Sequence, residues 1–197
     1  LLSLVGCESD RSANPSSITK AGLPGMKSDG SVLLPNQWSL RPAGRQIEIG
    51  DFPVNVAVHP SGKYAAVLHS GYGQHEIVVI AIPSGEITAR ENLKESFYGL
   101  EFSSSGKSLV SSGAGEEVVH VFHFEDGKLS NHRTLPLRDA NQRGVPAGLA
   151  LDHAAKKLYV ANVWGQRVTE LLLSGKKKPT DIALAQGVTS RSVPRIR

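Results

Sequence analysis

The chain has 197 residues, of which 40% are hydrophobic and 20% charged, so it can bury a core and is not disordered throughout. Its formal net charge of +4 is spread evenly and gives no reason to expect a nucleic-acid partner. The single cysteine excludes a disulfide framework and a thiolate zinc site, and no apolar run approaches the roughly 20 residues of a membrane span.

Residues 1–7 resemble the end of a bacterial lipoprotein signal peptide. They finish in Leu4-Val5-Gly6-Cys7, which is similar to a lipobox, where cleavage precedes the cysteine and the thiol is lipidated. Only six residues come before Cys7, so we expect the start of the signal to be missing. The resemblance implies an exported protein of the bacterial cell envelope, anchored to a membrane through Cys7, with Glu8 favouring the outer membrane. The alternative is an apolar tail with a chance cysteine.

Residues 8–45 are rich in serine, asparagine, proline and glycine, and this composition predicts a polar tether with little regular structure. Residues 46–49 alternate polar and apolar side chains, so we expect one extra strand there.

Three internal repeats follow. They begin with Val-Ala-Val-His-Pro-Ser-Gly-Lys at residue 56, Leu-Glu-Phe-Ser-Ser-Ser-Gly-Lys at 100 and Leu-Ala-Leu-Asp-His-Ala-Ala-Lys at 149, spaced by 44 and 49 residues. A period in the forties is the size of one four-stranded propeller blade. Each repeat predicts four strands, the first the most hydrophobic and the fourth the most polar. We therefore predict an all-β propeller with blades at about 54–93, 97–137 and 146–182, then an irregular tail over 183–197. A β-sandwich is the alternative.

The repeats also resemble a known family. Leu158-Tyr159-Val160-Ala161-Asn162 is similar to the core of YVTN-type (WD40-like) propeller repeats, and His59-Pro60-Ser61-Gly62-Lys63 is similar to their turn. The third repeat departs from the pattern, because alanines replace the turn glycine. The resemblance implies a YncE-like propeller of about seven blades, of which this chain would hold three. In some relatives a phosphoesterase of the alkaline phosphatase superfamily follows the propeller.

The loop over residues 137–144 is the strongest candidate for ligand binding. It joins a fourth strand to the next first strand, so we expect it at the mouth of the central channel, where Arg138, Asn141 and Arg143 could hold an anion. The alternative is simply a longer loop. We also count Asn55 as a candidate ligand-binding residue.

The remaining polar groups carry weaker hypotheses. His69 and His75 flank a hairpin and could face each other near Glu76 as a cation site; the alternative is a polar hairpin tip. Glu116 and Glu117 are expected in the equivalent hairpin of the second repeat, and because adjacent strand residues point apart we do not expect them to form a catalytic pair. Residues 176–178, three lysines, are expected to form a solvated turn, with phosphate or membrane contact as the alternative.

No nucleophile with a base, phosphate loop or metal motif is present, so we predict no catalytic residues, metal site or cofactor in this chain. The leading interpretation is a non-catalytic binding module that takes a small molecule or a protein at the channel mouth. The alternative is the propeller part of an enzyme, either fused to a phosphoesterase or lactonase-like, with its catalytic residues outside this chain.

Overall fold

The computed structural model describes residues 22–41, 43–139, 141–152, 154, 156–164 and 166–184. Cys7 and the tail from residue 185 lie outside these ranges, so the lipid-anchor hypothesis stays a prediction. The chain divides into two compact units, residues 1–46 and 47–197. Among the described residues, no helix is long and apolar enough to cross a membrane.

The first unit holds a small antiparallel sheet of three two-residue strands: β1 (Gly25–Met26), β2 (Val32–Leu33) and β3 (Ser39–Leu40). A tight turn joins β1 to β2, with Gly30 at a φ of +77° and Asp29 accepting hydrogen bonds from Ser31. The described part of residues 8–45 thus contains six strand residues, within the little regular structure that the composition predicts. Local turn chemistry, which composition does not reveal, closes the hairpins.

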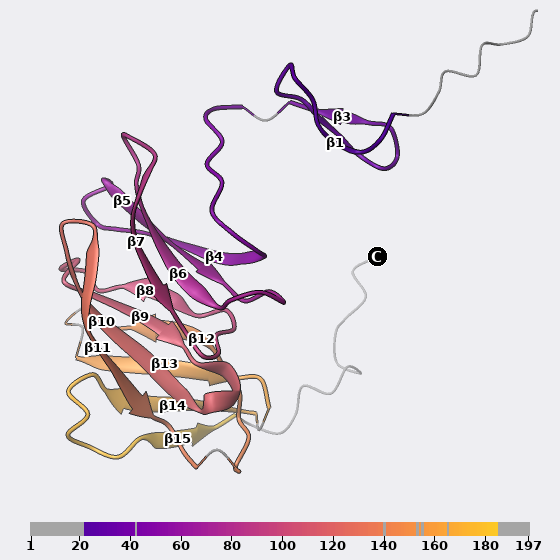
Figure 1. The fold of residues 1–197 in the computed structure, drawn as a ribbon. Helices are drawn as coiled ribbons and strands as arrows, with labels where there is room; N and C mark the ends of the chain where they lie inside the picture. Colours follow the sequence, from indigo (N-terminus) through magenta and orange to yellow (C-terminus); the bar gives the residue numbers. More distant parts are fainter. Residues whose placement is uncertain are drawn as a thin grey trace, which may run out of the picture. The chain divides into compact units, whose positions relative to one another are not determined.

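The second unit contains three four-stranded antiparallel sheets, each formed by strands consecutive in sequence (Figure 1). The first sheet comprises β4 (Pro53–Val58), β5 (Tyr64–His69), β6 (Glu76–Ala81) and β7 (Glu86–Asn92). The second comprises β8 (Leu100–Phe102), β9 (Ser108–Ser112), β10 (Val118–Glu125) and β11 (Lys128–Pro136), with a 3-10 turn, η1 (Ala114–Glu116), between β9 and β10. The third comprises β12 (Pro146–Leu151), β13 (Lys157–Asn162), β14 (Arg167–Leu172) and β15 (Thr180–Ala183).

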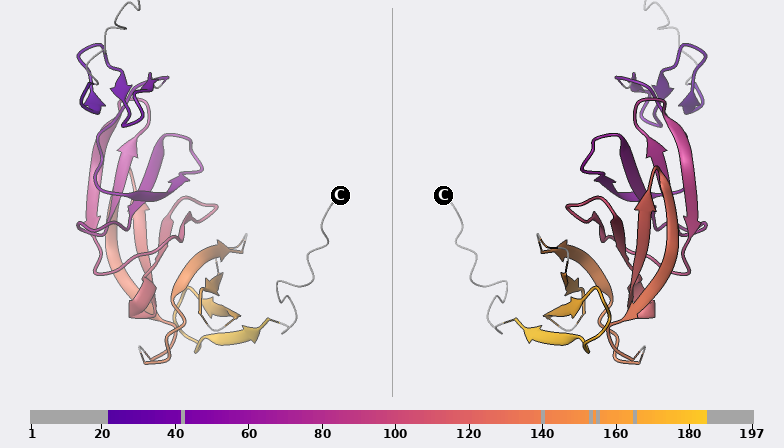
Figure 2. Two further views of the ribbon diagram at one scale, coloured as in Figure 1. Left: turned by 90° about the vertical axis from the view of Figure 1, so that its right-hand side faces the viewer. Right: turned by 90° about the vertical axis from the view of Figure 1, so that its left-hand side faces the viewer.

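The three sheets follow one another in an arc, as Figure 2 shows. Their first strands are neighbours, because β4 contacts β8 and β8 contacts β12. Meandering sheets arranged around a shared line of first strands are the blades of a β-propeller. The predicted fold class is confirmed, with three blades in the described part of the chain.

One position in each repeat fixes the turn between the first two strands of a blade. His59 accepts a hydrogen bond from the backbone of its turn, and Ser103 and Asp152 do the same in the second and third repeats. Gly62 and Gly106 adopt a positive φ, which glycine reaches without a steric penalty. The same position therefore caps the turn in all three repeats, with a different side chain in each.

Alternation along β10 separates two cores. Phe122 and Phe124 face the first blade and join an apolar cluster with Leu68, Leu109 and other side chains. Val119 and Val121 face the third blade, where the cluster is entirely aliphatic. Because successive strand residues point to opposite faces, one strand supplies both junctions.

Residues 46–49 do not form the expected strand. Ile47 and Ile49 instead pack against Val67, Val78 and Ile80 on the outer face of the first blade. Apolar burial rather than strand pairing holds this segment, and Arg90 adds a hydrogen bond to the carbonyl of Ile49.

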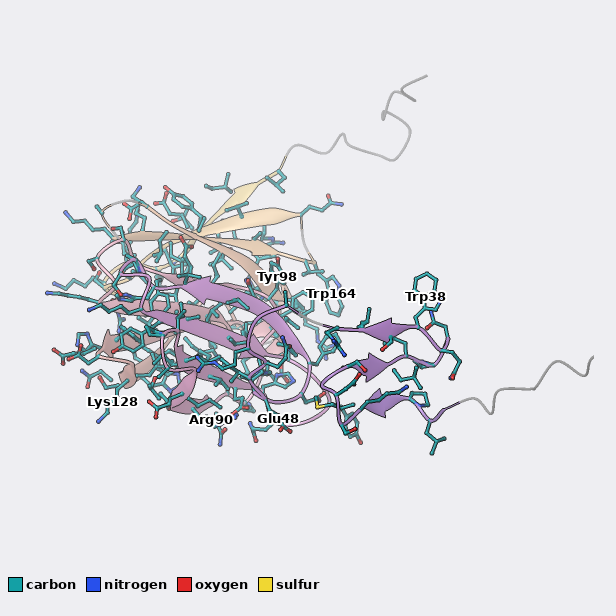
Figure 3. The ribbon with its side chains drawn as sticks, turned by 90° about the horizontal axis from the view of Figure 1, so that it is seen from above. Trp38, Glu48, Arg90, Tyr98, Lys128 and Trp164 are labelled. Atoms are coloured by element: carbon teal, nitrogen blue, oxygen red, sulfur yellow. The ribbon has the colours of Figure 1, made fainter. Side chains whose placement is uncertain are left out.

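The propeller unit has two faces, which differ in their connections. We call the face where β4, β8 and β12 begin the loop face, since the second strands end there and the third strands start there. The opposite face, which carries the turns after the first and third strands of each blade, is the turn face. Figure 3 shows Tyr98 and Trp164 toward one end of the sheets and Lys128 at the other.

Candidate functional site

Exposed aromatic side chains gather on the loop face. Every exposed aromatic residue of the described part of the propeller unit lies in a segment of this face: Phe52, Tyr72, Phe97, Tyr98 and Trp164. They are scattered in sequence, but each falls just before a first strand or between a second and a third strand. The repeat topology therefore returns all of them to one side of the molecule.

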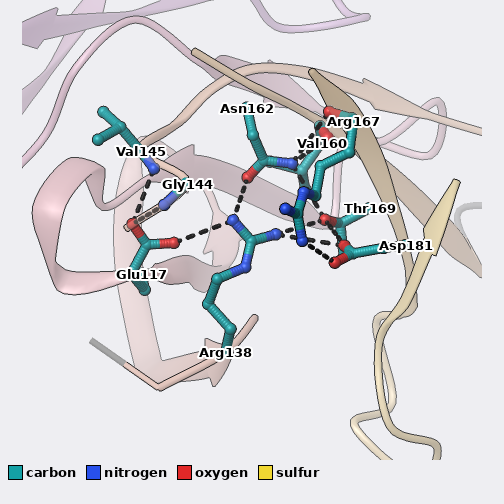
Figure 4. A network of polar contacts seen from close by, with 9 residues as sticks. All are labelled: Glu117, Arg138, Gly144, Val145, Val160, Asn162, Arg167, Thr169 and Asp181. Carbon is teal, nitrogen blue, oxygen red and sulfur yellow. Dashed lines mark hydrogen bonds and ion pairs between the residues drawn. The ribbon is translucent and has the colours of Figure 1, made fainter. Parts of the chain in front are cut away.

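The loop over residues 137–144 contains the predicted anion ligand Arg138, but this side chain is turned inward. It is only 5% exposed, and its guanidinium lies between two blades (Figure 4). Its Nη1 contacts Glu117 Oε2 at 3.3 Å and Asn162 Oδ1 at 3.1 Å, and its Nη2 contacts Thr169 Oγ1 at 2.8 Å and Asp181 Oδ1 at 3.3 Å. With its donors occupied by protein groups, Arg138 is a structural residue, and the anion hypothesis is wrong for it.

Glu117 holds the other side of this network. Its carboxylate is fully buried, and Oε1 accepts hydrogen bonds from the backbone N–H groups of Gly144 and Val145, both at 2.7 Å. Glu117 follows η1 in a left-handed conformation with a φ of +57°, in the hairpin between β9 and β10. A Cβ at Gly144 would overlap the Arg138 guanidinium, which explains why glycine occupies that position.

The network continues onto the third blade. Asp181 accepts a hydrogen bond from Thr169 and pairs with Arg167 at 2.9 Å. Burial tends to raise the pKa of Asp181, but the hydrogen bonds from Thr169 and Arg167 and the charge of Arg138 outweigh it and lower the pKa below its ordinary value. Asp181 therefore stays ionised and completes an alternating chain of charges from blade two to blade three.

The other predicted ligands are not assembled with Arg138. Asn141 and Arg143 are exposed on the same loop. Asn55 donates from its amide to the carbonyl of Tyr98 at 2.8 Å, linking the first strand of the first blade to the segment before β8. Asn141 and Arg143 remain candidate ligand-binding residues on the loop face, whereas Asn55 has a structural contact.

The two hairpin histidines have separate roles. His75 uses both ring nitrogens, because Nδ1 accepts the Ser96 N–H at 2.8 Å and Nε2 lies 3.1 Å from the Gly71 carbonyl. His69 is fully buried, its ring nitrogens lack hydrogen-bond partners, and its Nδ1 is 3.9 Å from Glu76. Burial lowers the pKa of His69, while the charge of Glu76 opposes this effect. Because His75 has no free lone pair, the geometry argues against a shared cation site.

A histidine pair that the sequence did not indicate lies in the second blade. His120 Nδ1 and His132 Nε2 are 3.1 Å apart, and Phe122 stacks on His132 at a centroid distance of 4.4 Å. A bulge in the pairing of β10 with β11 brings His132 into position. Burial is the main cause that lowers the pKa of His120, followed by repulsion from His132, while Glu116 opposes both. Among the described residues, no group of three or more potential metal ligands is assembled.

Two features of this region escaped the sequence analysis. Glu117 was weighed only as half of a catalytic pair with Glu116, and its structural role depends on a left-handed backbone and on a loop 27 residues later. The aromatic residues looked dispersed. Placing the loops of each repeat on one face could have predicted their convergence, since the repeat period alone implies that topology.

Comparison with solved structures supports the propeller fold. The chain is similar to hydrazine synthase from Kuenenia stuttgartiensis, with a TM-score of 0.56, 22% identity, and coverage of 76% of this chain and 51% of that one. It is also similar to a β-propeller domain from Myceliophteria thermophila, with a TM-score of 0.50, 14% identity, and coverage of 70% and 41%. A chain of a nidogen/laminin complex gives a TM-score of 0.52, 18% identity, and coverage of 66% and 48%.

The chain thus spans about half the length of these solved chains or less. No protein-family model and no curated protein matches it. The similarities establish the fold alone, because unrelated functions share propeller architectures. The described part of this chain therefore folds as three blades of a β-propeller.

Proposed function

We propose that this chain is the binding module of an exported, lipid-anchored bacterial envelope protein, a YncE-like propeller of the YVTN type. Its partner, a protein or a small molecule, would bind on the loop face at the mouth of the channel. The observation that carries the proposal is the group of five exposed aromatic side chains on that face. The lipobox-like sequence ending in Cys7 supports the anchored location.

Exposing large aromatic side chains to water is unfavourable unless a binding partner covers them. They are enriched at the centres of binding sites, where a large rigid ring buries area at little entropic cost. The neighbouring exposed Asn141 and Arg143 add polar groups that can fix the orientation of a ligand. Arg138 lies beneath this surface and holds the loop that presents it.

Site-specific photo-cross-linking in bacterial cells tests the binding site. A photoreactive residue replaces Tyr98 or Trp164 on the loop face, and Lys128 on the turn face serves as the matched control. We expect one adduct of the same mass from both loop-face positions, absent from the control and weakened by Phe97→Ala. Equal adducts from both faces, or none from the loop face, would contradict the proposal.

The anchor is tested separately on the full gene product. Labelling with a radioactive fatty acid should mark the wild-type protein and not the Cys7→Ser variant. Absence of label on the wild-type protein would contradict the lipid anchor, but it would not bear on the proposed binding at the loop face.

A further inference from the structure

Five lysines gather on the turn face of the third blade. Lys156 lies in the turn between β12 and β13, Lys157 is the first residue of β13, and residues 176–178 lie in the loop between β14 and β15. Both connections lie on the left of Figure 1. The N–H of Leu173 donates to the carbonyl of Lys156 at 3.0 Å, and Lys156 and Lys176 line one hollow over Leu172. We call these five residues the lysine patch.

Most of this charge has no counter-charge. Lys157 pairs with Glu170 at 3.2 Å, and the carboxylate of Asp152 accepts from the backbone N–H groups of the turn. The other four lysines are exposed and have no acidic partner within ion-pair distance among the described residues. Five lysines against two carboxylates leave a local excess of three positive charges, whereas the whole chain carries only +4.

The equivalent turns of the other blades lack this excess. Lys63 in the first blade is accompanied by Glu86, and Lys107 and Lys128 in the second are accompanied by Glu125 and Asp126. The excess is thus a property of one blade and not of the repeat. Mixed charges are typical of a solvated face, but a one-sign cluster raises the local concentration of anions.

The chemistry of the patch favours an anionic lipid surface as its partner. Neither connection carries a phenylalanine, tyrosine or tryptophan for base stacking. The arginine that reaches one of them, Arg133, already donates from Nη2 to the carbonyl of Leu173. Lysines act as point charges whose attractions to an acidic bilayer add up near its surface. We infer that the lysine patch docks the third blade on anionic phospholipid headgroups. This contact is separate from the proposed binding at the loop face.

Vesicle co-sedimentation tests the inference with the full chain carrying Cys7→Ser, so that no lipid anchor contributes. The vesicles contain phosphatidylcholine alone or phosphatidylcholine mixed with phosphatidylglycerol. The test variant combines Lys176→Gln, Lys177→Gln and Lys178→Gln. The matched control combines Lys63→Gln, Lys107→Gln and Lys128→Gln, which remove the same charge from exposed turns of the other blades.

We expect the parent to bind the acidic vesicles and not the neutral ones, and added salt to weaken the binding. The test variant should lose about a hundredfold in partitioning, and the control only a few-fold. Equal losses in the two variants, or equal binding to neutral vesicles, would overturn the inference. Tighter binding to a duplex nucleic acid that depends on the same lysines would also overturn it, because the partner would then be a different polyanion.

Discussion

The two junctions between blades are built from the same repeat but hold together differently. Between blades one and two, aromatic rings pack together, with Phe102 edge to face on Phe124 at 5.0 Å and His59 tilted against Phe124 at 4.7 Å. Between blades two and three, an aliphatic core is joined by the buried network of Glu117 and Arg138. The repeat fixes the backbone of a junction and leaves its chemistry free.

This difference has consequences for stability. Removing apolar atoms lowers the free energy of unfolding gradually, because apolar packing is non-directional. A buried ion pair behaves differently, since removing one partner leaves an uncompensated charge inside the protein. The second junction should therefore be the more sensitive to single polar substitutions, and the first to the loss of volume.

The largest expected effect comes from Arg138→Met. Glu117 would remain buried without its counter-charge, so we expect the free energy of unfolding to fall by about 3–5 kcal/mol. Urea denaturation measures the loss. The double variant Glu117→Gln with Arg138→Met should recover part of it, since no buried charge is left. A loss below about 1 kcal/mol for the single variant would show that the network is not a stabilising element of the junction.

Phe124→Ala tests the first junction. Phe124 is buried among His59, Tyr64 and Phe102, and its removal should cost about 3 kcal/mol through the lost contacts and the cavity left behind. The same denaturation measurement applies. If Phe124→Leu cost as much as Phe124→Ala, filling of the space would not be the reason for the stabilisation.

A smaller effect is expected for His59→Ala. His59 Nε2 donates to the Gly106 carbonyl at 3.2 Å, and its Nδ1 accepts from Ser61, so the ring joins the turns of two blades. Losing these contacts should cost about 1 kcal/mol in thermal or chemical unfolding. His59→Asn, which keeps the capping of its own turn, should recover part of this cost. No difference between the two variants would indicate that capping plays no role.

The smallest expected effects are changes in how the free energy of unfolding depends on pH. His120 has a lowered pKa, so the unfolded state binds its proton first, and the stability that neutral His120 contributes is lost as the pH falls below about 6.5. Asp181 also has a lowered pKa, so its contribution is lost only as the pH falls below about 4.

Unfolding measured across the pH range separates these contributions. His120→Gln should flatten the stability profile between neutral and mildly acidic pH, and Asp181→Asn should flatten it only in the more acidic range. A profile that Asp181→Asn changes near neutral pH would contradict the lowered pKa.

The fold could be predicted from the sequence more fully than the candidate site. The blades follow from apolar alternation and from turns at a fixed period, which are local in sequence, so the propeller could be predicted. The structural role of Arg138 could not be predicted, because its partners lie up to 43 residues away, on β14 and β15. Partner choice over such separations depends on how the sheets pack.

By itself, the sequence determined the three repeats, their strand order and the position of their capped turns, because each depends on neighbouring residues. Only the tertiary structure decided that Arg138 and Glu117 form an internal pair, that scattered aromatic residues share one face, and that lysines from two turns lie together. Those arrangements arise from the way strands stack into an arc, which places residues far apart in the chain within contact distance of one another.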